Sequence, residues 1–178
     1  DNIPGDFIEA GVWRGGATIF MRGVLAAYNI SDRIVWVADS FEGLPPSTLV
    51  QDRGINLTKE QFPVLSVGLE KVKELFERYN LLDDQVKFLK GWFKDTLPVA
   101  PIEKLSILRL DGDLYESTMD AFNALYDKVS IGGFIIIDDY NALKVCKEAV
   151  HDFRNKNHID DEMIKIDNSS IYWIKSRH

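Results

Sequence analysis

The sequence contains few of the residues that form disulfides and zinc sites. Among its 178 residues there is one cysteine, Cys146, and there are three histidines. A single cysteine excludes an intramolecular disulfide. The histidines lie late in the chain, at 151, 158 and 178, and none shares a motif with the acids Asp111, Asp138 and Asp139. These shortages argue against zinc, and Cys146 is interpreted as a small buried apolar residue.

Long apolar runs and an excess of basic residues are also absent. Apolar runs such as GGFIII at residues 132–137 are far too short to span a bilayer, and no signal-peptide pattern is visible. Lysine and arginine number 21 against 28 acidic residues, a formal net charge of −7, which argues against nucleic acid as a partner. We therefore expect a cytoplasmic protein that binds a small molecule, with a homo-oligomer left open.

The composition is that of a globular domain, with 46% hydrophobic and 28% charged residues. We expect residues 1–178 to form a single domain. The first strand pattern begins within the first eight residues, with no helix before it to cover the strand. From this we expect that an N-terminal segment, which would act as a lid, is missing ahead of it.

Strand-like and helix-like runs alternate along the chain, which predicts an α/β fold with a doubly wound, mostly parallel sheet. Strands are predicted at residues 5–10, 33–38, 85–89, 105–110 and 134–137. Helices are predicted at residues 17–28, 67–79, 115–129 and 143–155. Residues 163–166 and 171–174 are predicted to close the sheet as an antiparallel hairpin. The most apolar strand, 134–137, is predicted to be central.

One connection, residues 41–66, is unusually long and contains Pro45, Pro46 and Pro63. Long connections are often lids or binding loops, and the alternative is a disordered surface insertion. The sequence leaves both open, and we predict a mobile lid over the substrate.

A glycine-rich turn, EAGVWRGG at residues 9–16, follows the first predicted strand and precedes a helix. Glycines there let backbone amides approach a ligand at the helix N-terminus, although the dinucleotide pattern G-x-G-x-x-G is not met. Asp39 ends the second strand, where an acid can bind the hydroxyls of a ribose. Each feature alone could be a turn residue or a helix cap, but together they indicate a nucleoside-bearing cofactor. Glu9 would repel a pyrophosphate and suit a cationic group, which favours S-adenosylmethionine over NAD.

Two acidic motifs end the fourth and fifth predicted strands. They are Asp111-Gly112-Asp113 and Asp138-Asp139. Because the carboxyl ends of such strands line the ligand crevice, Asp111, Asp138 and Asp139 could converge on a hard cation such as Mg²⁺. A metal lowers the pKa of a hydroxyl, and Asp113 is then the candidate general base. The alternative is that Asp113 and Asp139 only cap helices.

Five segments together carry a family resemblance: residues 9–16, 36–45 (WVADSFEGLP), 88–97 (FLKGWFKDTL), 110–118 and 132–140. In these, and over almost the whole chain, the sequence resembles the macrocin O-methyltransferase (TylF-like) family. The resemblance implies a class I methyltransferase fold, which is Rossmann-like with a seven-stranded sheet. It also implies S-adenosylmethionine, a Mg²⁺ site and a small-molecule acceptor, expected to be a sugar hydroxyl on a natural product. Family members usually carry an N-terminal segment that helps to close the substrate site, and we expect that segment to be missing from this sequence.

The resemblance also implies roles for individual residues. Asp111, Asp138 and Asp139 would be metal ligands, and Asp113 the general base. The expected cofactor-binding residues are Glu9, Gly11, Val12, Gly15, Thr18, Asp39, Ser40, Gly91, Trp92, Phe93 and Asp111. Two rival functions remain, a methyltransferase fold that has become an inactive binding module and a nucleotide-dependent oxidoreductase.

Overall fold

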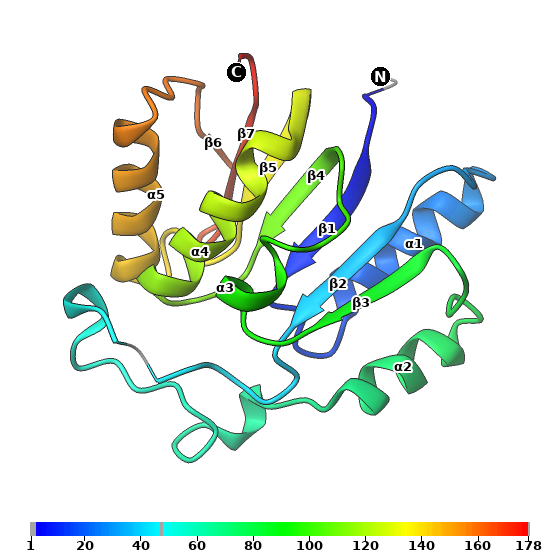
Figure 1. Ribbon diagram of the computed structural model, residues 1–178, viewed down its shortest axis with the longest axis horizontal. Helices are drawn as coiled ribbons and strands as arrows, with labels where there is room; N and C mark the ends of the chain where they lie inside the picture. Colours follow the sequence, from blue (N-terminus) through cyan, green and yellow to red (C-terminus); the bar gives the residue numbers. More distant parts are fainter. Residues whose placement is uncertain (1–2, 47, 178) are drawn as a thin grey trace.

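Seven strands form one sheet in the order β3-β2-β1-β4-β5-β7-β6 (Figure 1). The computed structural model describes residues 3–46 and 48–177. The strands are β1 Asp6–Ala10, β2 Val35–Asp39, β3 Val86–Lys90, β4 Leu105–Leu110, β5 Val129–Ile137, β6 Ile164–Lys165 and β7 Ile171–Ile174. The α-helices are α1 Gly16–Ala27, α2 Leu69–Arg78, α3 Phe93–Thr96, α4 Tyr115–Leu125 and α5 Lys144–Lys156. Three 3₁₀ turns accompany them, η1 Val50–Asp52, η2 Pro63–Leu65 and η3 Tyr126–Lys128.

Strands β1 to β5 pair in parallel, while β7 runs antiparallel to both β5 and β6. This arrangement confirms the doubly wound, mostly parallel sheet with its antiparallel hairpin at the end. The middle place in the sheet belongs to β4, however, and the apolar strand expected at the centre lies beside it as β5. Burial alternates along β5, so that only one of its two faces is fully covered. Its apolar run therefore did not indicate the central position.

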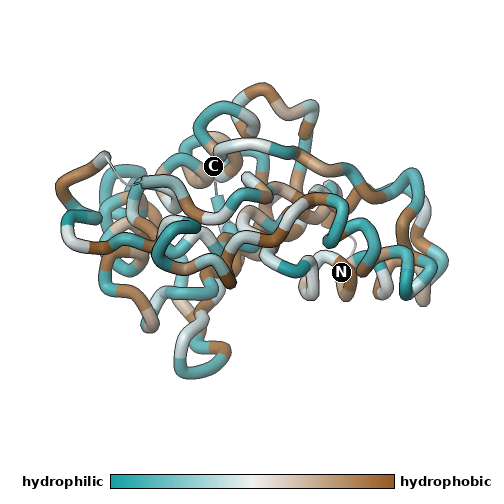
Figure 2. Tube along the Cα trace, turned by 90° about the horizontal axis from the view of Figure 1, so that it is seen from below, coloured by the Kyte–Doolittle hydropathy of each residue, from teal (hydrophilic) through white to brown (hydrophobic). Residues whose placement is uncertain are grey.

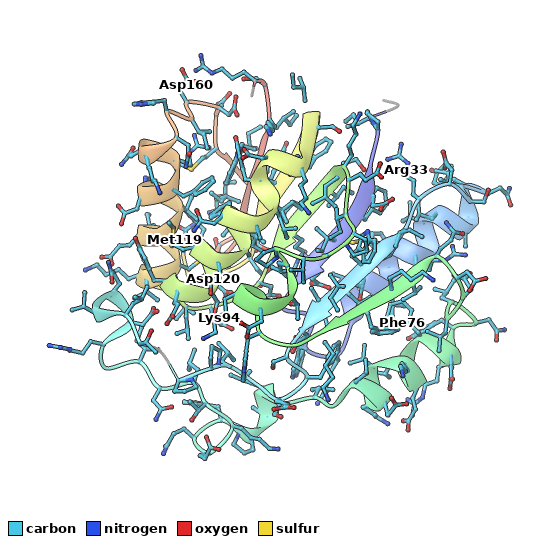
Figure 3. The ribbon with its side chains drawn as sticks, viewed as in Figure 1. Arg33, Phe76, Lys94, Met119, Asp120 and Asp160 are labelled. Carbon is cyan, nitrogen blue, oxygen red and sulfur yellow. The ribbon has the colours of Figure 1, made fainter. Side chains whose placement is uncertain are left out.

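Helices cover the two faces of the sheet unequally. On one face, Phe122 of α4 stacks on Phe153 of α5 with ring centroids 4.4 Å apart, and Trp173 of β7 completes this largest core. On the other face, α1 and α2 pack over β1, β2 and β3. There Phe76 of α2, labelled in Figure 3, meets Phe88 of β3 edge to face at 5.9 Å. Both layers are needed because β2 is buried on both sides.

Two predicted boundaries were wrong around residue 129. The helix expected to reach Val129 ends as an α-helix at Leu125 and continues as the 3₁₀ turn η3. Val129 already belongs to β5, where it pairs with Leu105. The register then shifts, and Gly132 adopts a positive φ of 84°, which lets the strand absorb the extra residues. A four-residue periodicity of apolar side chains could not distinguish the last helical turn from the start of the strand.

The parallel strands end at the same edge, and the 41–66 segment crosses beneath that edge (Figure 1, cyan to green). Apolar and polar residues alternate closely along the whole trace in Figure 2. Among the described residues, no helix combines the length and the apolar character needed to cross a membrane.

Candidate active site

The glycine-rich turn brings β1 and β4 into very close contact. Gly11 donates its backbone N–H to the carbonyl of Ala38 at 2.8 Å and has a positive φ of 91°. A Cβ atom on Gly11 would lie 1.8 Å from the carbonyl oxygen of Asp111. Only glycine fits this position, because a side chain would collide with the backbone. The turn therefore fixes the start of α1 against the end of β4.

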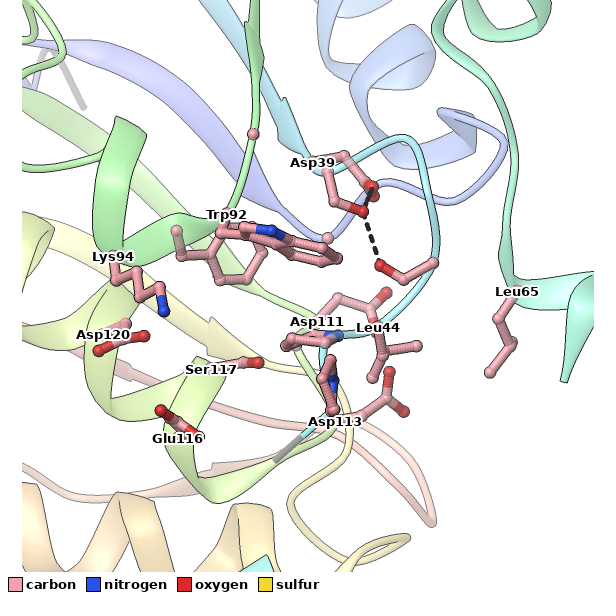
Figure 4. A pocket seen from close by; sticks show the side chains of 18 of the residues that line it. Asp39, Leu44, Leu65, Trp92, Lys94, Asp111, Asp113, Glu116, Ser117 and Asp120 are labelled. Atoms are coloured by element: carbon pink, nitrogen blue, oxygen red, sulfur yellow. Dashed lines mark hydrogen bonds between the residues drawn. The ribbon is translucent and has the colours of Figure 1, made fainter. Parts of the chain in front are cut away.

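Asp39, at the end of β2, binds this turn through its carboxylate. Its Oδ2 accepts hydrogen bonds from the backbone amides of Val12 at 2.8 Å and Trp13 at 3.3 Å. Its Oδ1 accepts from the amide of Phe41 at 2.7 Å and from the hydroxyl of Ser40 at 3.4 Å, the dashed line in Figure 4. Asp39, which is expected to bind ribose, thus holds the backbone of residues 12, 13 and 41 in place.

A cavity of about 490 Å³ opens at the carboxyl ends of the strands (Figure 4). It is lined by nine of the predicted site residues: Gly11, Asp39, Ser40, Gly91, Trp92, Phe93, Asp111, Asp113 and Asp138. Five others are not in its wall: Glu9, Val12, Gly15, Thr18 and Asp139. The cavity has the size of a small-molecule site.

The wall near Trp92 is built by a second sharp turn, between β3 and α3. Gly91 has a φ of 142° and donates its N–H to the carbonyl of Asp39 at 2.9 Å. Trp92 is the N-cap residue of α3, and its ring lies between Asp39 and the acidic residues in Figure 4. Lys94 and Asp120 lie close together at the far end of the cavity (Figures 3 and 4). Neither was among the predicted site residues, although Lys94 lies within the 88–97 segment that carries the family resemblance.

Carboxylates from the ends of β4 and β5 gather on one side of the cavity. Asp111, Asp113 and Asp139 each place an oxygen within 4.8 Å of the others. Asp138 is not part of this group, and its Oδ1 accepts from Arg109 at 2.5 Å and from Ser170 Oγ at 3.2 Å. Of the three ligands expected for the metal, two are thus grouped with the expected base.

Arg109 is a site residue that the sequence analysis missed. Its guanidinium forms ion pairs with Glu9, with Asp111 at 2.7 Å and with Asp138 at 2.5 Å. Glu9 is buried against it, only 2% exposed, and does not face the cavity. A signal was present in the sequence, because Arg109 is the one charged residue in the otherwise apolar run LSILRL.

Burial dominates the electrostatics of the acidic side chains. It raises the pKa of Asp113 to about 7, and the carboxylates of Asp111 and Asp138 add to the shift. Burial likewise raises the pKa of Asp139 to about 8. Glu9 has a pKa raised to about 8 by burial, although the charge of Arg109 opposes the change. Each shift reflects the cost of a negative charge held away from water.

The acidic group has the donor chemistry of a site for a hard cation. Three carboxylate oxygens within 4.8 Å suit Mg²⁺, which prefers oxygen ligands. In addition, Asp139 Oδ2 is buried with no hydrogen-bond partner among the described residues. A buried carboxylate oxygen without a partner is costly unless a cation or a proton joins it. The residues present therefore fit a divalent ion.

Contacts on both sides of the cavity hold the 41–66 segment in place. Asp52 accepts from the backbone amides of Tyr115 and Glu116, at 2.8 and 3.0 Å. On the other side, Trp13 Nε1 donates to the carbonyl of Val64 at 2.8 Å. The segment also contributes Leu44 and Leu65 to the cavity wall (Figure 4). No local pattern in the sequence pointed to Asp52, because its partners lie more than 60 residues away.

The sequence matches the family model described as macrocin-O-methyltransferase (TylF) over residues 1–175. It is 53% identical to demethyldecarbamoylnovobiocin O-methyltransferase of Streptomyces niveus, an alignment that covers 99% of this chain and 68% of the relative. It is 54% identical to 8-demethyl-8-(2,3-dimethoxy-alpha-L-rhamnosyl)-tetracenomycin-C 4'-O-methyltransferase of Streptomyces olivaceus, with 97% of this chain and 67% of the relative covered.

A solved structure agrees with these matches. The O-methyltransferase NovP is 52% identical in sequence and superimposes with a TM-score of 0.95, covering 99% of this chain and 74% of that chain. The cavity, the glycine-rich turn and the acidic strand ends lie where a class I methyltransferase fold has its site. The chain therefore belongs to the macrocin-O-methyltransferase family of O-methyltransferases.

Proposed function

We propose that this enzyme transfers a methyl group from S-adenosylmethionine to a sugar hydroxyl of a natural product, with the help of Mg²⁺. The observation that carries the proposal is a single cavity, which joins Asp39 and the glycine-rich turn to the carboxylates of Asp111 and Asp113. The cavity, of about 490 Å³, thus has one end at Asp39 that is proposed to bind the nucleoside, and another end at Asp111 and Asp113 that is proposed to carry the reaction.

The nucleoside end is formed by residues that hold their own backbone rigid. Asp39 is fixed by three backbone amides, and its Oδ1, whose other contact is the long 3.4 Å hydrogen bond from Ser40, can accept a hydrogen bond from a ribose hydroxyl. Trp92 supplies an aromatic face to the same wall. A pyrophosphate would meet a cavity lined by Asp39, Asp111 and Asp113, which disfavours NAD on electrostatic grounds.

The reaction end provides a base and a binding site for a cation. When bound, S-adenosylmethionine supplies the methyl group as an electrophile. Asp111 and Asp139, which belong to the group of three carboxylates, together with Asp138 as the third expected ligand, would hold Mg²⁺, which would supply positive charge that lowers the pKa of the acceptor hydroxyl. Asp113 would accept the hydroxyl proton at a carboxylate oxygen, and its raised pKa matches that task near neutral pH.

The acceptor is proposed to be a sugar on the basis of relatives. One of them is named for methylation at a 4' position of a compound that carries a dimethoxyrhamnosyl group. In this chain the 41–66 segment adds apolar Leu44, Pro45 and Leu65 to the cavity wall, a surface that suits the apolar part of such a compound. The apolar surface would also exclude water from the methyl group.

Calorimetry with S-adenosylhomocysteine tests the cofactor assignment. We expect binding by the wild-type chain and no heat with NAD. Asp39→Asn should weaken binding about 10- to 100-fold, because a hydrogen bond to a charged group is lost. Tight binding of NAD would overturn the assignment.

Turnover with a panel of rhamnosides and simple phenols tests the acceptor class. We expect methylation of the rhamnosides, loss of the activity in excess chelator and its recovery with added Mg²⁺. Full activity in chelator would contradict the metal requirement, and methylation of phenols alone would contradict the sugar acceptor.

A further inference from the structure

Arg109 is the residue around which the carboxylates of three neighbouring strands gather. Its Nη1 donates to the carboxylate of Glu9 in β1. The same nitrogen donates to the carboxylate of Asp111, just beyond β4, and this distance is 2.7 Å. Its Nη2 donates to Asp138, just beyond β5, at 2.5 Å. The side chain is 18% exposed, so these interactions are little screened by water.

The sheet register explains why one side chain reaches all three carboxylates. Arg109 pairs directly with Glu9 across β1 and β4, and with Ile136 across β4 and β5. Asp111 follows two residues later on the same strand, and a planar guanidinium can donate in several directions at once. A guanidinium stays protonated at any pH at which the protein is folded. The side chain therefore remains a cation.

This arrangement divides the acidic residues into two sets. Arg109 binds Oδ2 of Asp111 and Oδ1 of Asp138, and both residues line the cavity. It contacts neither Asp113 nor Asp139, which stay grouped with Asp111 within 4.8 Å. Asp111 thus belongs both to the set bound by Arg109 and to the group of three carboxylates. Its orientation is fixed by the hydrogen bond from the guanidinium to its Oδ2. A carboxylate held in this way presents a defined direction to any ligand.

We propose that Arg109 is a positioning residue of the methyl-transfer site. It orients the carboxylates of Asp111 and Asp138 in the cavity wall, and in this way it sets the affinity for S-adenosylhomocysteine and for Mg²⁺. The inference rests on the proposed function, because it concerns the ligands assigned there.

A purely structural role is the competing explanation. Glu9 is buried, and Arg109 could serve only to neutralise it. The two roles separate in a double variant. In Arg109→Met/Glu9→Gln both the arginine and the buried carboxylate of Glu9 are replaced by neutral side chains, so no buried charge of this pair is left without its partner. A purely structural role then predicts that the melting temperature and the affinities both return to their wild-type values. A positioning role predicts that only the melting temperature returns.

The experiment compares the wild-type chain with Arg109→Lys, Arg109→Met, Glu9→Gln and Arg109→Met/Glu9→Gln, where Glu9→Gln alone is the reference for the double variant because Glu9 is itself an expected cofactor-binding residue. Melting temperature reports the fold, and calorimetric titrations with S-adenosylhomocysteine and with MgCl₂ report the two affinities. We expect Arg109→Met to lower both affinities by roughly 10- to 100-fold, the usual effect of losing a residue that orients ligands. Arg109→Lys should lie between, since an ammonium cannot hold both carboxylates in the same plane. The double variant should recover the melting temperature and keep the weak affinities.

Arg22→Met is the matched control. Arg22 is a buried arginine paired with Asp83 at 2.5 Å, and neither residue lines the cavity. Its loss should lower the melting temperature and leave both affinities unchanged. If Arg109→Met does not fold, the lysine variant and the double variant still decide the question.

Wild-type affinities in the double variant would overturn the inference, as would wild-type affinities in Arg109→Lys and Arg109→Met together. In either case the proposed function would stand. If instead the wild-type chain bound no S-adenosylhomocysteine, the proposed function would fail and the inference with it.

Discussion

Asp52 caps a helix that begins 63 residues later in the chain: its Oδ1 lies 2.8 Å from the backbone nitrogen of Tyr115, the first residue of α4. Its Oδ2 accepts from the next amide, that of Glu116, at 3.0 Å. No side chain within α4 or at its N-cap makes this cap. Because α4 starts two residues after Asp113, the 41–66 segment and the candidate base are joined through one carboxylate.

Asp52→Ala should therefore destabilise the fold by about 0.5–2 kcal/mol, the usual range for a lost helix cap. Denaturant unfolding measures this. The matched control is Asp152→Ala, which removes the acceptor of the Tyr115 hydroxyl and should cost less. An equal effect of the two variants would show that the cap has no special importance.

Trp13 should hold the end of the 41–66 segment that contains Val64 in place. Trp13→Phe keeps an aromatic ring but removes the Nε1 donor to the carbonyl of Val64. We expect faster hydrogen exchange in residues 63–66, with unchanged exchange in β4. In the wild-type chain, cofactor and acceptor together should slow exchange across the segment. Strong protection before any ligand is added would instead make the segment a fixed part of the fold.

Gly11 should tolerate no side chain. Gly11→Ala places a Cβ atom 1.8 Å from the carbonyl oxygen of Asp111, at a backbone φ of 91°. We expect a loss of about 2–4 kcal/mol and no measurable binding of S-adenosylhomocysteine. Gly16→Ala is the control, because no atom lies within 4 Å of its added Cβ and it occupies the first position of α1. That change should be neutral or mildly stabilising.

The roles of Asp111 and Asp113 should separate in kinetics. Asp111→Asn should weaken Mg²⁺ binding, so that added metal partly restores turnover. Asp113→Asn should reduce turnover roughly a hundredfold or more, as expected for a lost general base, with no recovery in excess Mg²⁺. The proximity of Asp111, Asp113 and Asp139 makes the contrary result informative. If added metal restored Asp113→Asn, this residue would be a ligand and another base would be needed.

The Arg22–Asp83 pair should make stability depend on acid pH. The hydrogen bond from Arg22 holds the pKa of Asp83 below its ordinary value of 3.8, so the folded state favours the charged form. The stabilisation is thus complete well above pH 3.8 and disappears as the pH falls through the lower, folded-state pKa. Asp83 is 42% exposed, which limits the contribution to about 1 kcal/mol or less.

Thermal unfolding of the wild-type chain and Asp83→Asn across a range of pH checks this. Their difference should be constant from pH 5 to 8 and shrink below pH 4. A difference that persists undiminished at pH 2 would mean that the charge on Asp83 contributes nothing.

Local sequence patterns were sufficient to predict where most of the alternating strands and helices lie. The strand predicted at 105–110 coincides with β4, and the helix predicted at 143–155 with α5 to within one residue at each end. Such agreement follows from apolar spacing, which depends only on neighbouring residues. The error at Val129 arose where a helix and a strand meet with no glycine or proline between them. There, pairing with Leu105 decided the outcome.

By itself, the sequence determined the order of the strands and of the four longer helices, the glycine-rich turn at residues 9–16 and the acidic strand ends, because each is a short motif whose geometry is local. It also carried the family resemblance that the comparisons confirm. Tertiary structure alone decided which acids meet. Asp138 turns to Arg109 while Asp113 joins Asp111 and Asp139, and Asp52 caps a helix far along the chain. These contacts depend on the register of adjacent strands and on where a long connection folds back, and neither leaves a periodic signal in the sequence.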